Sequence, residues 1–328
     1  MDKIAASFSA VNVMPIKVIR NTSLVRQIVY AHKIPPIHLQ LNPVNRCNFA
    51  CSFCSCANEH DDNELDVEMV DTLAYEFAKL GASAITITGG GEPTLHHEFG
   101  GIVSLFQRLG YDISLVTNGA SLAKVGAKIL RALTWCRVSL SDEHTITDIK
   151  NGLIDAVSRA PSVAWGMSYV VTAEPRYDGL VEAIHFANDM KMTHLRVVSD
   201  ILDEDGSPDV SEIKRVVNFL DKDIDDSRVV YQGRKHPTSG RKNCWIGLLK
   251  PNITADGFIT PCCGVMYARD KPDRCFPKDM MMGHVDNIQH IWKEQKPFDG
   301  SQCVRCYYDD YNSLLANMLA EIDHENFV

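Results

Sequence analysis

Two periodicities alternate along the chain. Short apolar runs typical of strands are each followed by a longer segment in which apolar residues recur every third or fourth position, as on one face of a helix. Strands are expected at residues 37–41, 84–88, 113–117, 137–140, 167–172 and 194–199, and helices at 66–80, 99–109, 122–133, 146–157, 180–190 and 210–224. This strict alternation predicts an α/β fold in which helices cover a parallel sheet, either an open doubly wound sheet or a barrel.

The two ends of the chain depart from this pattern. Residues 1–36 carry one short helical pattern that ends before Pro35 and Pro36, because proline cannot continue a helix. After about residue 225 the sequence is rich in loops, and a turn at 255–257 between two strand-like pieces predicts a hairpin. We therefore expect an N-terminal extension at 1–36, a core at 37–225, and a smaller C-terminal domain with a hairpin and a helix at 226–328.

Composition and charge are those of an ordinary soluble globular protein, with 45% apolar and 23% charged residues. The net charge of -9 gives no broad positive surface for nucleic acid. One local basic cluster is interpreted as a solvated loop; it comprises Arg234, Lys235, His236, Arg241 and Lys242. No apolar run reaches bilayer-spanning length and the first 20 residues lack the pattern of a secretion signal, so we predict a cytoplasmic protein with no membrane contact.

The cysteines change the picture, because the chain has 11 of them and they fall into two groups. Four lie between residues 47 and 56 and six between 244 and 306, while Cys136 stands alone. In a reducing compartment such cysteines are more often metal ligands or catalytic groups than disulfides. Two groups of cysteines therefore indicate two sites.

The first group has the spacing C-x3-C-x2-C at Cys47, Cys51 and Cys54. Three thiolates this close in sequence select an iron-sulfur cluster, zinc or copper rather than a hard cation. The alternatives are a zinc site, for which Cys56 or His60 would be the fourth ligand, and three inert thiols. We interpret Cys56 as a bystander.

The stretch 45–56 resembles the signature of the radical S-adenosylmethionine (SAM) enzymes, with the aromatic Phe53 just before the third cysteine. The resemblance implies a partial (β/α)6 barrel and a [4Fe-4S] cluster on Cys47, Cys51 and Cys54. Its fourth iron would bind the amino and carboxylate groups of SAM. An external electron donor of the flavodoxin or ferredoxin type is implied as well.

A glycine run at the end of the second expected strand matches a further motif of that family. Gly90, Gly91 and Glu92 correspond to the Gly-Gly-Glu motif, whose carboxylate pairs with the amino group of SAM; an ordinary turn is the alternative. The resemblance implies cofactor contacts from Gly90, Gly91, Glu92, Asn118, Ser139 and Phe53, with Ser139 preferred for the ribose. Arg196, on the sixth strand, either meets a carboxylate or phosphate of the substrate or forms a salt bridge.

The second group places four cysteines where they can complete one metal centre. The hairpin would bring Cys244 and Cys262 together, and Cys303 and Cys306 would approach from the side of the C-terminal helix. This arrangement resembles the Twitch domain, a shortened relative of the SPASM domain, and implies one auxiliary [4Fe-4S] cluster. A four-cysteine zinc site is the alternative, because thiolates suit both metals.

These resemblances lead to the hypothesis of a radical SAM oxidoreductase. It would cleave SAM reductively to a 5'-deoxyadenosyl radical, abstract a hydrogen atom from the substrate, and oxidise a sugar, cyclitol or nucleotide with the auxiliary cluster as electron acceptor. No residue is assigned as a catalytic acid or base.

Two other kinds of radical SAM enzyme remain open at this point. One is a peptide- or protein-modifying enzyme, and the other is an epimerase in which Cys263 or Cys275 returns a hydrogen atom to the substrate, although a structural thiol is the favoured interpretation of both. The alternative from another class is a non-enzymatic iron-sulfur or zinc protein, in which the motif at Gly90 to Glu92 would have no purpose.

Overall fold

The computed structural model describes residues 15–56, 61–203, 206–232, 240–265, 279–303 and 306–321. Several residues singled out in the sequence lie outside these ranges, namely His60, Arg234, Lys235, His236 and Cys275.

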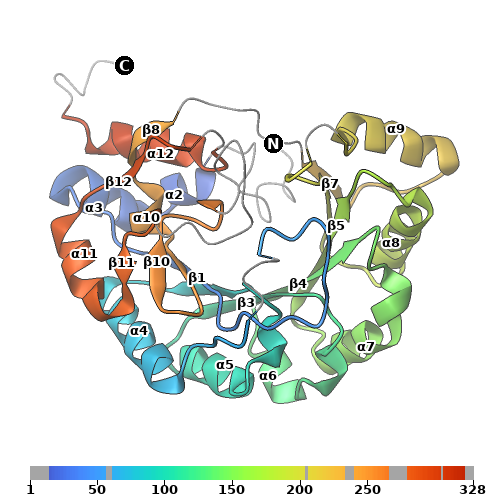
Figure 1. Ribbon diagram of the computed structural model, residues 1–328, viewed down its shortest axis with the longest axis horizontal. Coiled ribbons are helices and arrows are strands. Elements are labelled where there is room, and N and C mark those ends of the chain that lie inside the picture. Colours follow the sequence, from blue (N-terminus) through green and yellow to red (C-terminus); the bar gives the residue numbers. More distant parts are fainter. Residues whose placement is uncertain are drawn as a thin grey trace.

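A curved, mostly parallel sheet forms the centre of the molecule (Figure 1). Its parallel strands lie side by side in chain order: β1 (His38–Leu41), β2 (Ala84–Ile87), β3 (Asp112–Thr117), β4 (Trp135–Ser141), β5 (Ala164–Val171), β6 (Leu195–Ser199) and β7 (Val229–Gln232). In the described part of the chain β7 ends the sheet and does not pair with β1. The predicted partial barrel is confirmed.

Helices cover the outer face of this sheet, as Figure 1 shows. They are α4 (Val67–Leu80), α5 (Phe99–Arg108), α6 (Ala127–Arg131), α7 (Ile146–Arg159), α8 (Tyr177–Asp189) and α9 (Val210–Leu220). Each buries apolar residues at helical spacing, such as Val70, Leu73 and Phe77 of α4. Burial of these stripes against the β-strands forms one continuous core.

Two predictions inside the barrel were wrong. The single helix expected at 122–133 is a short 3-10 turn at Leu122–Lys124 followed by α6, because Gly126 between them has an extended backbone. The core was expected to end at residue 225, whereas the charged segment 221–227 leads into a seventh strand, β7, which pairs with β6. Its four residues are too few to stand out from a polar surrounding by alternation alone.

The C-terminal residues add a hairpin to the same sheet. This part contains β8 (Arg241–Cys244), α10 (Ile246–Leu249), β9 (Asn252–Ile253), β10 (Phe258–Thr260), β11 (Gly283–His284), α11 (Ile288–Glu294), β12 (Phe298–Gly300) and α12 (Asp309–Leu319). The predicted hairpin is formed by β9 and β10. The expected C-terminal domain shares the central sheet, because β9 pairs in parallel with β1 and so satisfies the edge that β1 would otherwise expose.

The described part of the N-terminal extension, residues 15–36, contains two helices where one was expected, α2 (Ile16–Arg20) and α3 (Thr22–Ala31). They lie beside α10 and α12 at one end of the barrel (Figure 1). The Ile34 N–H donates to Oε1 of Gln295 at 2.7 Å, which ties the extension to the segment after α11. None of the described helices is both long and apolar enough to cross a membrane.

Candidate cofactor and substrate site

The first cysteine group lies in the loop that leaves β1. The Cys54 N–H donates to the Cys51 carbonyl at 3.1 Å, and Cys47 Sγ accepts from the Phe49 N–H at 3.5 Å. Burial raises the pKa of Cys51 to about 11, and the neighbouring Cys54 thiol adds to the shift. All three thiols are partly exposed and close enough to interact electrostatically, so the structure gathers the predicted ligands at the opening of the barrel.

Gly91 holds this loop against the end of β2. Its N–H donates to the Val44 carbonyl at 2.8 Å, and the Glu92 N–H donates to the Arg46 carbonyl at 2.8 Å. A Cβ on Gly91 would lie 2.0 Å from the Arg46 oxygen, so no larger residue fits without moving the loop. A Cβ on Gly90 would similarly lie 2.4 Å from Oδ1 of Asn45. The glycines thus permit close approach of the backbone to the cysteine loop.

Glu92 is buried, with 2% of its surface exposed. Its Oε1 accepts hydrogen bonds from the Thr94 N–H (3.1 Å), the Thr94 hydroxyl (2.5 Å) and the Thr117 hydroxyl (2.6 Å). Its Oε2 accepts from the Asn118 N–H at 2.7 Å. The carboxylate therefore joins the ends of β2 and β3, and its contact with the amino group of SAM stays a prediction.

Three rim contacts to the cysteine loop were missed in the sequence. Asn118 Nδ2 donates to Oδ1 of Asn48 at 2.7 Å, and Oε2 of Glu143 accepts from the Ser52 N–H at 2.9 Å. The Phe49 ring lies 4.2 Å from the His144 ring, centroid to centroid. Glu143 and His144 lie two and three residues after the end of β4, so their position after a strand was the signal that would have found them.

The other predicted cofactor contacts are Ser139 on β4 and Phe53 in the cysteine loop. Ser139 pairs with Ser168 in register and shares a strand face with Arg137, which lines the barrel cavity, so its predicted ribose contact stays a prediction. Asp142 is buried and accepts hydrogen bonds from the Thr172 N–H at 2.6 Å and the Arg176 N–H at 2.8 Å, which makes it a structural link between rim loops. The remaining candidate, Phe53, lines the cavity.

The second cysteine group gathers at the other side of the barrel opening. Burial raises the pKa of Cys244 to about 12, with Cys306 and Cys303 adding to the shift. Burial also raises the pKa of Cys262, with contributions from Cys263, Cys244 and Cys306. Thus the four predicted ligands, from β8, the end of β10 and the segment before α12, lie within electrostatic reach of one another.

Asn312 fixes the turn at Cys244 and was not predicted. It is completely buried in α12, and its Oδ1 accepts from the Trp245 N–H at 2.7 Å and the Ile246 N–H at 2.9 Å. Its Nδ2 lies 3.7 Å from Cys244 Sγ, within hydrogen-bond range for sulfur. A side chain that donates to a ligand sulfur tunes a cluster, so Asn312 belongs to this candidate site.

Cys56 of the first group, predicted to be a bystander, lies close to the second group. It packs against a small apolar cluster of Val265 and Met280, which also contacts Cys262 and Cys303. The cysteine loop after β1 therefore reaches the C-terminal cysteines.

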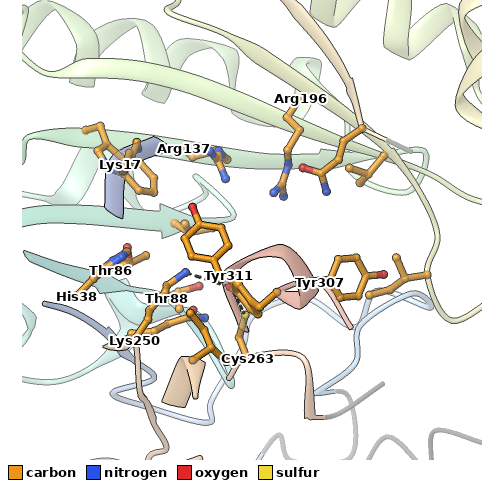
Figure 2. A pocket seen from close by; sticks show the side chains of 18 of the residues that line it. Lys17, His38, Thr86, Thr88, Arg137, Arg196, Lys250, Cys263, Tyr307 and Tyr311 are labelled. Atoms are coloured by element: carbon orange, nitrogen blue, oxygen red, sulfur yellow. Dashed lines mark hydrogen bonds between the residues drawn. The ribbon is translucent and has the colours of Figure 1, made fainter. Parts of the chain in front are cut away.

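A cavity of about 510 Å³ lies between the two groups (Figure 2). Its wall includes Phe53 next to Cys54, Cys263 next to Cys262, and Lys17 from the N-terminal extension. Tyr307, Tyr308 and Tyr311 supply an aromatic side. Lys17 was not predicted as a site residue, because nothing in the first 36 residues marks it.

Both cysteine sets fit iron-sulfur clusters in their donor chemistry. Thiolates are soft ligands that iron-sulfur clusters select, and a bound metal centre stabilises several adjacent thiolates. Three thiolates leave one iron of a cubane open, and four thiolates close it.

Comparison with known proteins identifies one domain of the chain. Residues 41–145 match the model of the Radical SAM superfamily, and this segment contains the cysteine triplet, the Gly-Gly-Glu motif and Asn118. The chain contains a radical SAM domain. The resemblance stated for residues 45–56 is thereby confirmed, and the cofactors of such a domain are a [4Fe-4S] cluster and SAM.

Curated relatives of the radical SAM domain cover part of the chain. A probable GTP 3',8-cyclase of Sulfolobus acidocaldarius is 26% identical over 183 residues, which are 52% of this chain and 57% of the relative. A probable GTP 3',8-cyclase of Saccharolobus solfataricus is 35% identical over 127 residues, which are 37% of this chain and 40% of the relative. The chain therefore spans less than two thirds of these relatives.

Solved structures share the fold over most of the chain. SuiB of Streptococcus suis, bound to its precursor peptide SuiA, has a TM-score of 0.57 at 16% identity and covers 84% of this chain and 70% of its own. The protein anSMEcpe, with AdoMet and a peptide bound, has a TM-score of 0.53 at 14% identity and covers 90% of this chain and 86% of its own. At such identities the likeness concerns the fold alone.

Proposed function

We propose that this radical SAM protein is an oxidoreductase that oxidises a small molecule held in the barrel cavity. One observation carries the proposal. Phe53, which adjoins Cys54, and Cys263, which adjoins Cys262, both line that cavity. The two cysteine sets thus adjoin one substrate space, and a two-electron oxidation needs both a radical source and an electron acceptor beside its substrate.

When bound, the cofactors at Cys47, Cys51 and Cys54 supply a 5'-deoxyadenosyl radical, and an auxiliary cluster at the C-terminal cysteines accepts an electron. Loss of one hydrogen atom, one electron and one proton from the substrate would together amount to a two-electron oxidation. An external flavodoxin- or ferredoxin-type protein is the donor we propose for the initial electron.

The chain's own residues position the cofactors and the substrate. The cysteine loop is fixed to three strand ends, because Arg46 accepts from the Glu92 N–H, Asn48 accepts from Asn118 Nδ2, and the Ser52 N–H donates to Glu143. These contacts would hold a cofactor at a set distance from the cavity. The tyrosines and Phe53 line the cavity with aromatic surface, which excludes water from a reactive radical. The SAM contacts that we propose from the family resemblance are Gly90, Gly91, Glu92, Asn118, Ser139 and Phe53.

Size and relatives favour a small-molecule substrate over a peptide. The cavity of about 510 Å³ falls within the usual range for small-molecule sites. The curated relatives are named for a reaction of GTP, a nucleotide, whereas the two similar structures hold peptides. A peptide-modifying enzyme remains the alternative substrate class.

Epimerisation is a second candidate because the Cys263 thiol lies in the cavity wall (Figure 2). The Cys263 sulfur lies 3.6 Å from the Tyr308 hydroxyl oxygen. A thiol there can return a hydrogen atom to a substrate radical. Reaction in deuterated water separates the two functions: an epimerase that uses Cys263 incorporates deuterium at the inverted carbon, and an oxidase releases an oxidised product without it.

Iron content and SAM cleavage test the main proposal. Anaerobically reconstituted protein should hold about eight irons per chain, falling to about four when Cys47, Cys51 and Cys54 are replaced by Ala, and also to about four when Cys303 and Cys306 are replaced. With SAM and dithionite, the wild-type protein should release 5'-deoxyadenosine, and the first variant should not. Bound zinc without cleavage of SAM would contradict the proposal.

A further inference from the structure

The cavity wall carries an excess of positive charge. Four cations line it, and they come from four separate segments: Lys17 from α2, Arg137 from β4, Arg196 from β6 and Lys250 from just after α10. Among the described residues that line the cavity, Asp200 is the only carboxylate. Figure 2 shows Lys17, Arg137 and Arg196 along one side and Lys250 near Cys263 on the other.

Arg137 is held in place by a neutral group. Its Nε donates to Nε2 of His194 at 3.1 Å, which requires that this nitrogen carry no proton. His194 Nδ1 lies 3.0 Å from the Thr193 hydroxyl, which donates to the Trp165 carbonyl at 2.8 Å. Burial, Arg137 and Arg196 together lower the pKa of His194 to about 3, so the imidazole stays neutral beside the guanidinium group.

The fold makes room for this arrangement on β5. Gly166 pairs with Arg137 in register, and a Cβ there would lie 2.3 Å from Cε1 of His194. Two residues further, Ser168 pairs with Arg196. Strand β5 lies between β4 and β6. On the face that carries Arg137 and Arg196, the β5 residues between them are therefore the small Gly166 and Ser168.

The cations act on one another. Burial lowers the pKa of Arg137, with Arg196 as the next cause, and burial lowers the pKa of Lys17, with Lys250 and Arg137 as the next causes. Gathering like charges in a partly buried space costs free energy, and such clusters commonly mark functional sites.

Lys250 differs from the other three. Its Nζ donates to the Tyr308 hydroxyl at 3.1 Å. Burial lowers the pKa of Lys250, whereas the neighbouring Cys263 and Cys262 favour its charged form. Lys250 therefore faces the C-terminal thiols, where bound thiolates would offset its charge. The remaining cations of the cavity are Lys17, Arg137 and Arg196.

We propose that Lys17, Arg137 and Arg196 bind a phosphate group of the substrate, an inference that rests on the proposed function in taking the cavity as the substrate site. Two guanidinium groups and an ammonium match the two negative charges and three oxygen acceptors of a phosphate better than the single charge of a carboxylate. The substrate class is then a phosphate ester or a nucleotide. Its phosphate lies against these cations, and its reacting carbon lies toward Phe53.

Binding of inorganic pyrophosphate tests this site without any turnover. Calorimetry on the reconstituted protein, without dithionite, compares pyrophosphate with citrate, a carboxylate anion of similar charge. We expect pyrophosphate to bind at least tenfold more tightly than citrate, and Arg196→Gln and Lys17→Met to weaken pyrophosphate binding at least tenfold. Arg196→Lys should restore part of the affinity, and the exposed Arg108→Gln on α5 is the matched control that should bind as the wild type does.

The outcomes separate this inference from the proposed function. Equal binding of citrate, or unchanged pyrophosphate binding in both cavity variants, overturns the phosphate site even if the protein cleaves SAM. Absence of SAM cleavage by the wild-type protein overturns the proposed function. Even then, pyrophosphate binding that weakens in the Arg196 and Lys17 variants supports the anion site. Thermal unfolding of each variant shows that a loss of binding does not come from a loss of folding.

Discussion

The Glu92 carboxylate accepts a hydrogen bond from the backbone N–H of Asn118 at 2.7 Å and so joins the strand that precedes the Gly-Gly-Glu motif to its neighbour. Because Asn118 also donates to Asn48, this one contact connects both strand ends to the cysteine loop. The acidic residue of the motif is thus part of the scaffold that holds the radical-generating loop.

Glu92→Gln should therefore weaken both the scaffold and SAM cleavage. The Gln side chain would place an NH2 group opposite N–H and O–H groups that now donate to the carboxylate. We therefore expect a loss of about 1–3 kcal/mol in the free energy of unfolding and slower release of 5'-deoxyadenosine. Chemical denaturation and product chromatography measure the two effects. Glu98→Gln, on an exposed residue of the same segment, is the control, and a Glu92→Gln variant as stable as that control would contradict the structural role.

Gly91→Ala should empty the first cluster site and spare the second. The added Cβ would lie 2.0 Å from the Arg46 carbonyl oxygen, so the cysteine loop has to move away from β2. We expect iron content to fall from about eight to about four per chain, with little SAM cleavage. Gly100→Ala is the matched control, since its Cβ would meet Ile129 at an ordinary 3.6 Å. Full iron content in Gly91→Ala would mean that the close approach is not required.

Asn312→Leu should act on the C-terminal cysteines alone. The buried side chain accepts two backbone hydrogen bonds beside Cys244, and its loss leaves the Trp245 and Ile246 N–H groups without that acceptor. We expect a loss of about 2–4 kcal/mol in the free energy of unfolding and about four irons fewer per chain. Asn317→Leu, on an exposed position of the same helix, should change neither. Equal iron content in the two variants would exclude a role for Asn312 in this site.

Much of the architecture follows from the sequence, because burial of the strands and helix stripes dictates their apolar periodicity. The radical SAM motif was readable too, since its ligands are contiguous in the chain. The roles of Lys17 and Asn312 could not be predicted from the sequence. A lysine in a terminal extension and a polar residue in a helix gain such roles only when segments far apart in the chain pack together. The strand β7 was missed because its four residues follow a charged segment.

The contact between His194 and Arg137 should make folding stability depend on pH. The pKa of His194 is lowered to about 3 in the folded protein from 6.5, because it is buried and faces Arg137 and Arg196. A group with a lowered folded pKa binds fewer protons when folded, so its contribution to stability is present above pH 6.5 and is lost as pH falls toward 3. Between these values the loss should approach about 1.4 kcal/mol per pH unit. Chemical denaturation of the wild type and of His194→Gln at pH 7.5 and pH 5.5 measures it. The variant should lose less stability than the wild type on acidification, and parallel losses in the two proteins would mean that His194 is protonated as readily when folded as when unfolded.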